Sequence, residues 1–242
     1  MSLPVFIAPG PFVTGVEVTL AGDEGRHAVV VRRIRVGEQL VLTDGAGASA
    51  TCSVVSLAKA ALVATVEAVS FEERPSPVVT VVQAIPKGDR GELAVEVLTE
   101  VGVDRIVPWA ASRCVGVWRG ERAEKSLAKW RSAARESGKQ SRRSWLPDVT
   151  PVATTEDVVA LLEVADLGVV LHEAATAPLA ALPASEARSI VVVVGPEGGI
   201  SDEELAAFSA AHVVRLGSSV LRTSTAGVAA VSALLSRTQR WG

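Results

Sequence analysis

Two short glycine-bearing segments near the end of the chain carry the residues best suited to chemistry. One is Gly195-Pro196-Glu197-Gly198-Gly199, and the other is Gly217-Ser218-Ser219-Val220-Leu221-Arg222. Glycines have no side chain, so backbone N–H and C=O groups can approach a flat ligand closely. Glu197 adds a carboxylate that can hydrogen-bond a substrate. Arg222 adds a permanently charged guanidinium that suits a phosphate or a developing oxyanion.

Each of these features also has a purely structural interpretation. Gly195–Gly199 can form a tight turn, and Glu197 can interact favourably with the dipole of a following helix. Arg222 can form a surface salt bridge. Several glycines within five residues are more than one turn needs, so we favour a ligand-binding loop.

The elements around these segments explain how they would be brought together. Short apolar strands are predicted at Ile190–Val194 and Val213–Leu216, directly before the two segments. A helix is predicted after each, the first capped by Ser201 with Glu204 three residues later. Loops at the carboxyl ends of parallel strands are where open α/β sheets bind ligands. The second helix is expected to be capped by one of three hydroxyl residues, namely Thr223, Ser224 or Thr225.

Strands and helices alternate from residue 78 onward, which predicts a mostly parallel α/β sheet. Leu93, Val97 and Val101 mark one face of a helix that Asp89 can cap, and Gly102 suits its end. The other predicted elements are strands at Val78–Ala84, Arg105–Pro108 and Leu167–Leu171, a basic helix from Glu121 to Lys139, and a helix from Thr154 or Thr155 to Ala165.

The first 72 residues have a different pattern, with short runs that contain Val and Thr separated by turn residues. This pattern predicts a small β-barrel or sandwich. The polar segment Phe71–Pro77 carries two prolines and is a linker candidate. We therefore expect domains at 1–72 and 78–242, with residues 73–77 between them. The predicted strands are Val16–Leu20, Gln39–Thr43, Ala50–Ser56 and Ala61–Val69, and a short helix is expected at His27–Arg33.

Composition narrows the classes of protein. The chain has 242 residues, 48% of them hydrophobic, and only two cysteines, which fits a reducing cytoplasm. We expect no signal peptide, membrane span or metal site. Formal net charge is −3, yet basic residues outnumber acidic ones nine to three between Arg119 and Arg143. Such a cluster indicates either a localised phosphate contact or a solvated helix face.

Several common enzyme motifs are missing from the sequence. It contains no G-x-x-x-x-G-K-[ST] loop and no G-x-G-x-x-G opening a first βα unit, which disfavours a P-loop NTPase and a nicotinamide-dependent oxidoreductase. It also contains no G-x-S-x-G elbow.

Taken together, the motifs resemble a known family. Gly195-Pro196-Glu197-Gly198-Gly199, followed by Leu216-Gly217 and Val220-Leu221-Arg222-Thr223, is similar to the SPOUT-superfamily methyltransferases that modify uridine N3 of 16S ribosomal RNA. The resemblance continues through Gln83–Arg90, Thr99–Val103, Ile106–Pro108 and Ser112-Arg113. It extends to Glu136 with Gln140–Arg143 and Pro147, and more weakly to His27, Arg33, Val36-Gly37 and Asp44-Gly45.

The resemblance implies a fold and a cofactor. The expected fold is a small PUA-like β-barrel followed by an α/β domain with a C-terminal trefoil knot. The expected cofactor is S-adenosylmethionine, bound in the knot by three loops of a homodimer whose active site borrows residues from the partner subunit. The cofactor-binding residues expected from this family are Leu171, Gly195, Pro196, Gly198, Gly199, Leu216, Gly217, Val220, Leu221 and Ala226.

The resemblance also implies roles for charged residues. Arg222 would stabilise charge on the uracil, and Glu197 would act as base or orienter. The RNA, as 16S rRNA or the small subunit, would be held by Arg32, Arg33, Arg35, Lys87, Arg90, Arg142 and Arg143. The sequence departs from the family in lacking an Arg within Met1–Pro9 and in having Ser224 where a Glu is usual. Two alternatives remain, a ribose 2′-O-methyltransferase of this fold and a non-catalytic RNA-binding protein.

Overall fold

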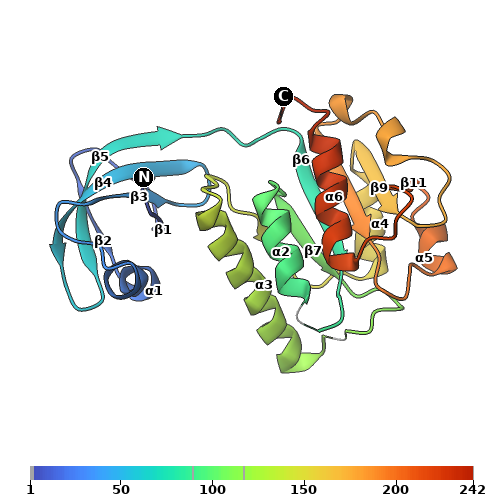
Figure 1. Ribbon diagram of the computed structural model, residues 1–242, viewed down its shortest axis with the longest axis horizontal. Coiled ribbons are helices and arrows are strands. Elements are labelled where there is room, and N and C mark those ends of the chain that lie inside the picture. Colours follow the sequence, from blue (N-terminus) through green and yellow to red (C-terminus); the bar gives the residue numbers. More distant parts are fainter. Residues whose placement is uncertain (1–2, 89, 117, 242) are drawn as a thin grey trace. The chain divides into compact units, whose positions relative to one another are not determined.

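The computed structural model describes residues 3–88, 90–116 and 118–241, so the predicted cap at Asp89 lies outside the described residues. The chain divides into two units (Figure 1). Unit 1 comprises Met1–Arg74 with Lys139–Leu146, and unit 2 comprises Pro75–Gly138 with Pro147–Gly242.

Unit 1 is built on a five-stranded sheet in the order β1-β3-β4-β5-β2. All of its strand pairs are antiparallel except β1 with β3. The sequence predicted four of these strands and missed β1, because three residues are too few to show alternation. The strands are β1 (Val5–Ile7), β2 (Glu17–Leu20), β3 (Gln39–Thr43), β4 (Ala48–Leu57) and β5 (Leu62–Phe71).

The core of unit 1 comes from the alternating inward residues of its strands, such as Cys52 on β4 and Leu62 on β5. A helix, α1 (Gly22–Arg26), runs directly into a π-helical turn at His27–Val31. The helical segment therefore starts earlier than the predicted His27–Arg33 and also ends earlier. Glu24 of α1 pairs with Lys139 at 3.0 Å in a buried contact, which anchors Lys139–Leu146 to the unit.

Unit 2 is built on a six-stranded sheet in the order β11-β9-β10-β6-β7-β8, with every pair parallel. Its centre is formed by β10 (Ser189–Val194) and β6 (Val78–Ala84), whose residues are buried on both faces apart from the first of each strand. Continuous apolar runs of this kind are typical of parallel strands covered on both sides. The remaining strands are β7 (Arg105–Trp109), β8 (Asp148–Val149), β9 (Leu167–Leu171) and β11 (His212–Val214).

Helices cover both faces of this sheet (Figure 1). On one face, Leu98 and Val231 belong to a core cluster that α2, α3 and α6 share with the strands. On the other, Val158 of α4 and Phe208 at the end of α5 pack in a second cluster. The helices are α2 (Arg90–Glu100), α3 (Gly120–Gln140), α4 (Thr155–Glu163), α5 (Asp202–Ala207) and α6 (Thr223–Leu235).

Two predicted helix caps are confirmed. Ser201 and Glu204 form a capping box at the start of α5, and Thr154 begins α4 in the same way. The prediction for α6 is wrong. Its N-cap is Arg222, whose extended backbone begins the helix with no side-chain capping bond. The hydroxyl residues instead occupy the first turn, where Thr223 and Ser224 are buried.

The strand β11 ends at Val214 rather than at the predicted Leu216. Arg215 turns away from β9, because its N–H donates to Ala177 O and its carbonyl accepts from Leu179 N. The residues from Arg215 onward are thereby released into the loop that leads to α6.

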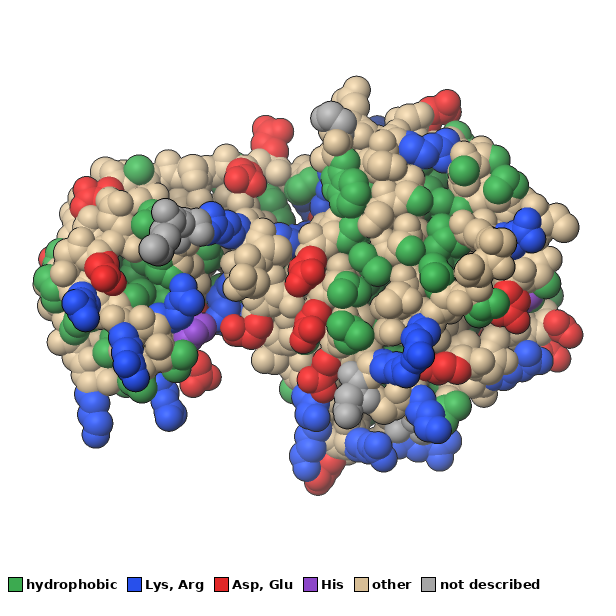
Figure 2. All heavy atoms as spheres, in the orientation of Figure 1, with side chains coloured by type: hydrophobic (Ala, Val, Ile, Leu, Met, Phe, Trp, Pro, Cys, Tyr) green, Lys and Arg blue, Asp and Glu red, His purple; other side chains and the backbone are tan. Residues whose placement is uncertain are grey.

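The apolar face predicted for α2 differs from the face that the helix buries. Ala94, Val95 and Leu98 pack against the sheet, whereas Leu93 is 45% exposed. The sequence of α2 has apolar residues on two sides, and periodicity alone does not choose between them. Figure 2 shows that hydrophobic side chains along α6 also reach the surface, where they are partly exposed.

A buried ion pair anchors the segment after α6 to the first strand of unit 2. Arg240 Nη1 lies 2.6 Å from Asp104 Oδ2 and 2.8 Å from Pro77 O, and Asp104 Oδ2 also accepts from Val79 N at 2.8 Å. The two side chains are 9% and 2% exposed.

Replacing Arg240 by Ala should therefore remove the guanidinium that pairs with the buried Asp104 carboxylate. We expect the free energy of unfolding to fall by about 3–5 kcal/mol, as measured by urea denaturation. The exposed neighbour Gln239, replaced by Ala, is the matched control. A decrease below about 1 kcal/mol in Arg240→Ala would show that this pair does not anchor the segment.

Candidate active site

Three loops at the carboxyl ends of the adjacent strands β10, β9 and β11 enclose a cavity of about 400 Å³. A volume of this size lies in the usual range for small-molecule sites. The position follows the rule by which the sequence singled out two of these loops, those after β10 and β11. The cavity is lined by Arg90, Leu171, His172, Glu173, Val194, Gly195, Pro196, Glu197, Gly199, Ile200, the run Arg215–Arg222, Thr223 and Ala226.

The structure brings most of the predicted site residues together in this lining. Of the ten expected to bind the cofactor, nine line the cavity and Gly198 does not. Both expected catalytic residues, Arg222 and Glu197, also line it. Arg90, expected to bind RNA, contributes to the wall as well.

Gly198 has a packing role instead. A Cβ added there would lie 2.8 Å from the carbonyl oxygen and 2.9 Å from the Cβ of Arg113, so only glycine fits without movement. Arg113 belongs to the loop that follows β7. The same loop is held by Glu204, whose Oε1 accepts from Ser112 N at 2.7 Å. Gly198 therefore lets the segment after β7 pack against the segment after β10.

The glycines that do line the cavity expose backbone to it. A Cβ on Gly195 would lie 2.7 Å from Ile200 Cγ1, and Gly199 has φ +75°, a conformation that side chains disfavour. Gly217 has open space beside its Cα. The apolar lining includes Leu171, Leu216 and Val220. Apolar side chains beside exposed backbone amides suit a flat ligand that also needs hydrogen-bond partners.

Glu197 connects two loops of the site. Its side chain is exposed, and its Oε1 accepts a hydrogen bond from Lys87 N at 3.3 Å. Lys87 lies between β6 and α2, near Arg90 on the cavity wall. This contact makes Glu197 an organiser of the loop after β6.

Arg222 presents an exposed guanidinium to the cavity. Its carbonyl accepts from Thr225 N and Ala226 N at 2.9 Å each, so its backbone is fixed as the start of α6. Within the described ranges, the guanidinium has no ion pair or hydrogen bond. A fixed backbone with an unpaired cation suits a group that meets negative charge on a substrate.

The sequence interpretation missed part of the lining, chiefly His172, Glu173 and Arg215. His172 Nδ1 accepts from Ala174 N at 3.2 Å, which shapes the loop after β9. Glu173 brings a second carboxylate to the cavity wall. The signal was available, since His172 and Glu173 directly follow the strand Leu167–Leu171 and so stand where ligand-binding loops begin.

The environment of the two cysteines does not favour the reactive thiolate form. Burial raises the pKa of Cys52 to about 11, with a smaller contribution from Glu67, and burial also raises the pKa of Cys114. Both thiols therefore stay protonated at neutral pH. Across the described ranges, no group of three or more His, Cys, Asp or Glu side chains is arranged to hold a metal ion. No helix in those ranges is long and apolar enough to cross a membrane.

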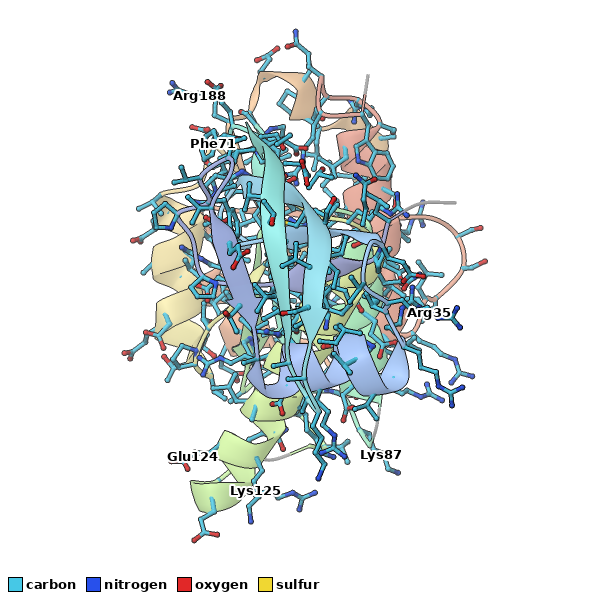
Figure 3. All side chains as sticks on the ribbon, turned by 90° about the vertical axis from the view of Figure 1, so that its left-hand side faces the viewer. Arg35, Phe71, Lys87, Glu124, Lys125 and Arg188 are labelled. Atoms are coloured by element: carbon cyan, nitrogen blue, oxygen red, sulfur yellow. The ribbon has the colours of Figure 1, made fainter. Side chains whose placement is uncertain are left out.

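The residues expected to bind RNA are mostly exposed. Arg32, Arg33 and Arg35 lie in one loop of unit 1, and the labelled Arg35 points away from the ribbon in Figure 3. Arg33 has φ +54° and Arg142 has φ +56°, conformations uncommon for residues other than glycine. Arg143 is half-buried, and Lys87 is exposed in unit 2.

Comparison with known proteins identifies the class. An RNA methyltransferase domain matches residues 72–235, and an RNA methyltransferase PUA domain matches residues 20–67. The chain therefore belongs to the RNA methyltransferase family. The expected architecture, a PUA-like domain and an α/β methyltransferase domain with a parallel sheet, is confirmed.

The particular relatives share one name. The chain is 47% identical to ribosomal RNA small subunit methyltransferase E of Mycobacterium bovis, covering 94% of this chain and 89% of that protein. It is 30% identical to the Bacillus subtilis protein of that name, covering 91% and 90%. The crystal structure of the Neisseria gonorrhoeae protein of that name, bound to S-adenosyl methionine, superposes with a TM-score of 0.86 at 30% identity, covering 97% and 98%.

Proposed function

We propose that this protein transfers a methyl group from S-adenosylmethionine to N3 of a uridine in the 16S rRNA of the small ribosomal subunit. The observation that carries the proposal is the guanidinium of Arg222 on the wall of a cavity formed by strand-end loops, where it has no ion pair with any described residue and its backbone is fixed at the start of α6. Relatives named for the modification of small-subunit rRNA support the substrate class.

The cavity residues fit the cofactor. The backbone of Gly195–Gly199 and Leu216–Leu221 would contact the adenine ring and ribose, and Leu171 and Ala226 would pack against them. Glu173 offers a carboxylate to a ribose hydroxyl or to the amino group of the methionine end. When bound, the cofactor supplies a methyl group activated by its sulfonium charge.

The chain's own residues must handle the charge of the uracil. Neutral uracil carries a proton on N3 and is a poor nucleophile there. Arg222 stabilises the negative charge that spreads to O2 and O4 as this proton leaves, a preorganised electrostatic contribution. Ser224 occupies the position where the family usually has a carboxylate, and it is 4% exposed. Glu197 accepts a hydrogen bond from Lys87 N, so we assign Glu197 the role of orienting the loop after β6. We propose that the proton on uracil N3 is transferred to water.

The deciding experiment combines labelled S-adenosylmethionine with small subunits from cells lacking this gene, followed by nucleoside analysis. We expect label in 3-methyluridine. Replacing Arg222 by Ala should lower the rate about 100- to 1,000-fold, while the thermal unfolding midpoint stays unchanged because the side chain is exposed.

Other outcomes of this assay would contradict the proposal. Label in a 2′-O-methyl nucleoside would support S-adenosylmethionine as cofactor but would show that the methyl group goes to the ribose and not to uracil N3. No label, from a protein that also fails to bind S-adenosylmethionine by calorimetry, would favour the RNA-binding alternative. An unchanged rate in Arg222→Ala would remove this residue from the mechanism.

The arginines of unit 1 extend the proposal to RNA binding. We assign residues 1–72 to RNA binding and residues 78–242 to catalysis, with 73–77 as linker. Arg32, Arg33 and Arg35 share one exposed loop, fixed by the buried Ile34 between them. Among the described side chains, none forms an ion pair with these three guanidiniums. We propose that they, with Arg142, Arg143, Lys87 and Arg90, contact rRNA phosphates.

Replacing Arg32, Arg33 and Arg35 together by Ala should weaken binding to rRNA. The dependence of log affinity on log salt concentration should become shallower by about 1 for each phosphate that the variant no longer binds. Filter-binding titrations at several salt concentrations measure this slope. Lys59→Ala, an exposed cation elsewhere in unit 1, is the control. An unchanged slope would exclude this loop from the RNA interface.

We further propose a cytoplasmic homodimer joined through α2 and α6. Apart from three residues in its first turn and Ser232, α6 is apolar or glycine all round. A helix with this composition is normally buried on every side. Yet Val228, Ala229 and Ala233 remain partly exposed, and Leu93 on α2 adds a 45% exposed side chain.

Replacing Leu93 by Glu should shift the protein from dimer to monomer in sedimentation equilibrium, because it places a charge in an apolar interface. Glu96→Ala, also exposed on α2, should leave the dimer intact. A wild-type protein that stays monomeric at micromolar concentration would refute the proposed homodimer.

A further inference from the structure

Gln83, the penultimate residue of β6, holds a buried amide that is only half satisfied. The residue is 0% exposed. Its Nε2 donates to Ala84 O at 3.1 Å and to Thr223 O at 3.3 Å. Its Oε1 is buried and has no hydrogen-bond partner in the part of the chain that the structure describes.

The surroundings of this amide oxygen are apolar. It lies 3.6 Å from where a Cβ on Gly227 would stand, and the same point is 3.1 Å from Leu98 and 3.3 Å from Val194. A buried acceptor without a donor destabilises the folded state, whereas an apolar side chain of the same shape would avoid that penalty. An amide at this position therefore calls for an explanation other than stability.

The position of Gln83 in the sheet explains why an amide is found there. In the sheet, Gln83 is in register with Val194, the residue directly before Gly195. Its other contact, Thr223, directly follows Arg222. The amide thus connects the strand beside the Gly195–Gly199 loop to the first turn of α6, where Arg222 is the N-cap and no side-chain capping bond exists.

We propose that Gln83 is a positioning residue for Arg222. Its bond to the Thr223 carbonyl fixes the first turn of α6 against β6, and so sets where the Arg222 guanidinium stands relative to the loop after β10. This inference rests on the proposed role of Arg222. The buried Oε1 without a donor lowers the stability of the folded state, and the alignment of Arg222 is the function that explains why this cost is kept.

The test is Gln83→Met, which keeps the length of an unbranched side chain and removes both amide groups. We expect an unfolding midpoint equal to or above that of the wild type, a methylation kcat at least 10-fold lower, and a KM for rRNA changed less than 3-fold. Affinity for S-adenosylhomocysteine, measured by calorimetry, should change less than 3-fold.

Two comparisons separate positioning from general stability. In an Arg222→Ala background, Gln83→Met should have no further effect on kcat, because its action passes through Arg222. The control Thr99→Val removes a buried hydroxyl that donates to Val95 O within α2, and it should leave kcat unchanged. Equal additive decreases in both backgrounds would overturn the inference.

A readout independent of methylation keeps the inference testable if the proposed reaction is wrong. The N–H groups of Thr225 and Ala226 both donate to Arg222 O. Their hydrogen exchange should accelerate at least 5-fold in Gln83→Met and stay unchanged in Thr99→Val. Unchanged exchange in Gln83→Met would refute the positioning role whatever the substrate proves to be.

Discussion

The strand β10 is the constraint on which the rest of unit 2 depends. Five consecutive β-branched residues, Ile190–Val194, are buried on both faces, so the strand must lie inside the sheet with helices above and below it. Its neighbours β6 and β9 are parallel to it and carry similar runs. With both faces occupied, the carboxyl ends of the strands are where the sheet can present backbone to a ligand, and β10 ends directly at Gly195. The glycine loop therefore continues directly from a strand that is buried on both faces.

Much of this arrangement could be predicted from the sequence because it depends on local patterns. The strands of unit 2 other than the unpredicted two-residue β8 show as largely apolar runs, and the capping box at Ser201 shows as a spacing of three residues. Features that depend on which surfaces meet could not be predicted in this way. The buried side of α2, the start of α6 at Arg222 and the three-residue strand β1 are examples. The trefoil knot was expected only from the family resemblance, because the hydrophobic periodicity of a sequence does not show whether the chain passes through a loop. The knot stays a prediction.

In the candidate site too, residues in local sequence patterns were predicted, whereas roles that depend on tertiary contacts were not. Gly195, Gly217 and Arg222 were found because they belong to glycine-bearing segments that lie between a predicted strand and a predicted helix. Glu173 satisfies the same rule but sits in a loop with no glycine motif to draw attention to it. Gly198 belongs to the motif and yet packs against Arg113, which only the three-dimensional neighbours reveal. The role inferred for Gln83 depends on a residue 140 positions away in the sequence, beyond any local pattern.

The anchoring of Arg240 also has a consequence for how the protein is made. Asp104, buried in the turn before β7, meets its cation 136 positions later in the sequence. The helix α6, which completes one face of the sheet, is also made late. Chains fold from the N-terminus as they are synthesised, and unit 1 has all its segments once Leu146 has emerged. Unit 2 cannot close its core until Arg240 follows. All segments of unit 1 are therefore present, while the chain is still attached to a ribosome, well before the second unit is complete.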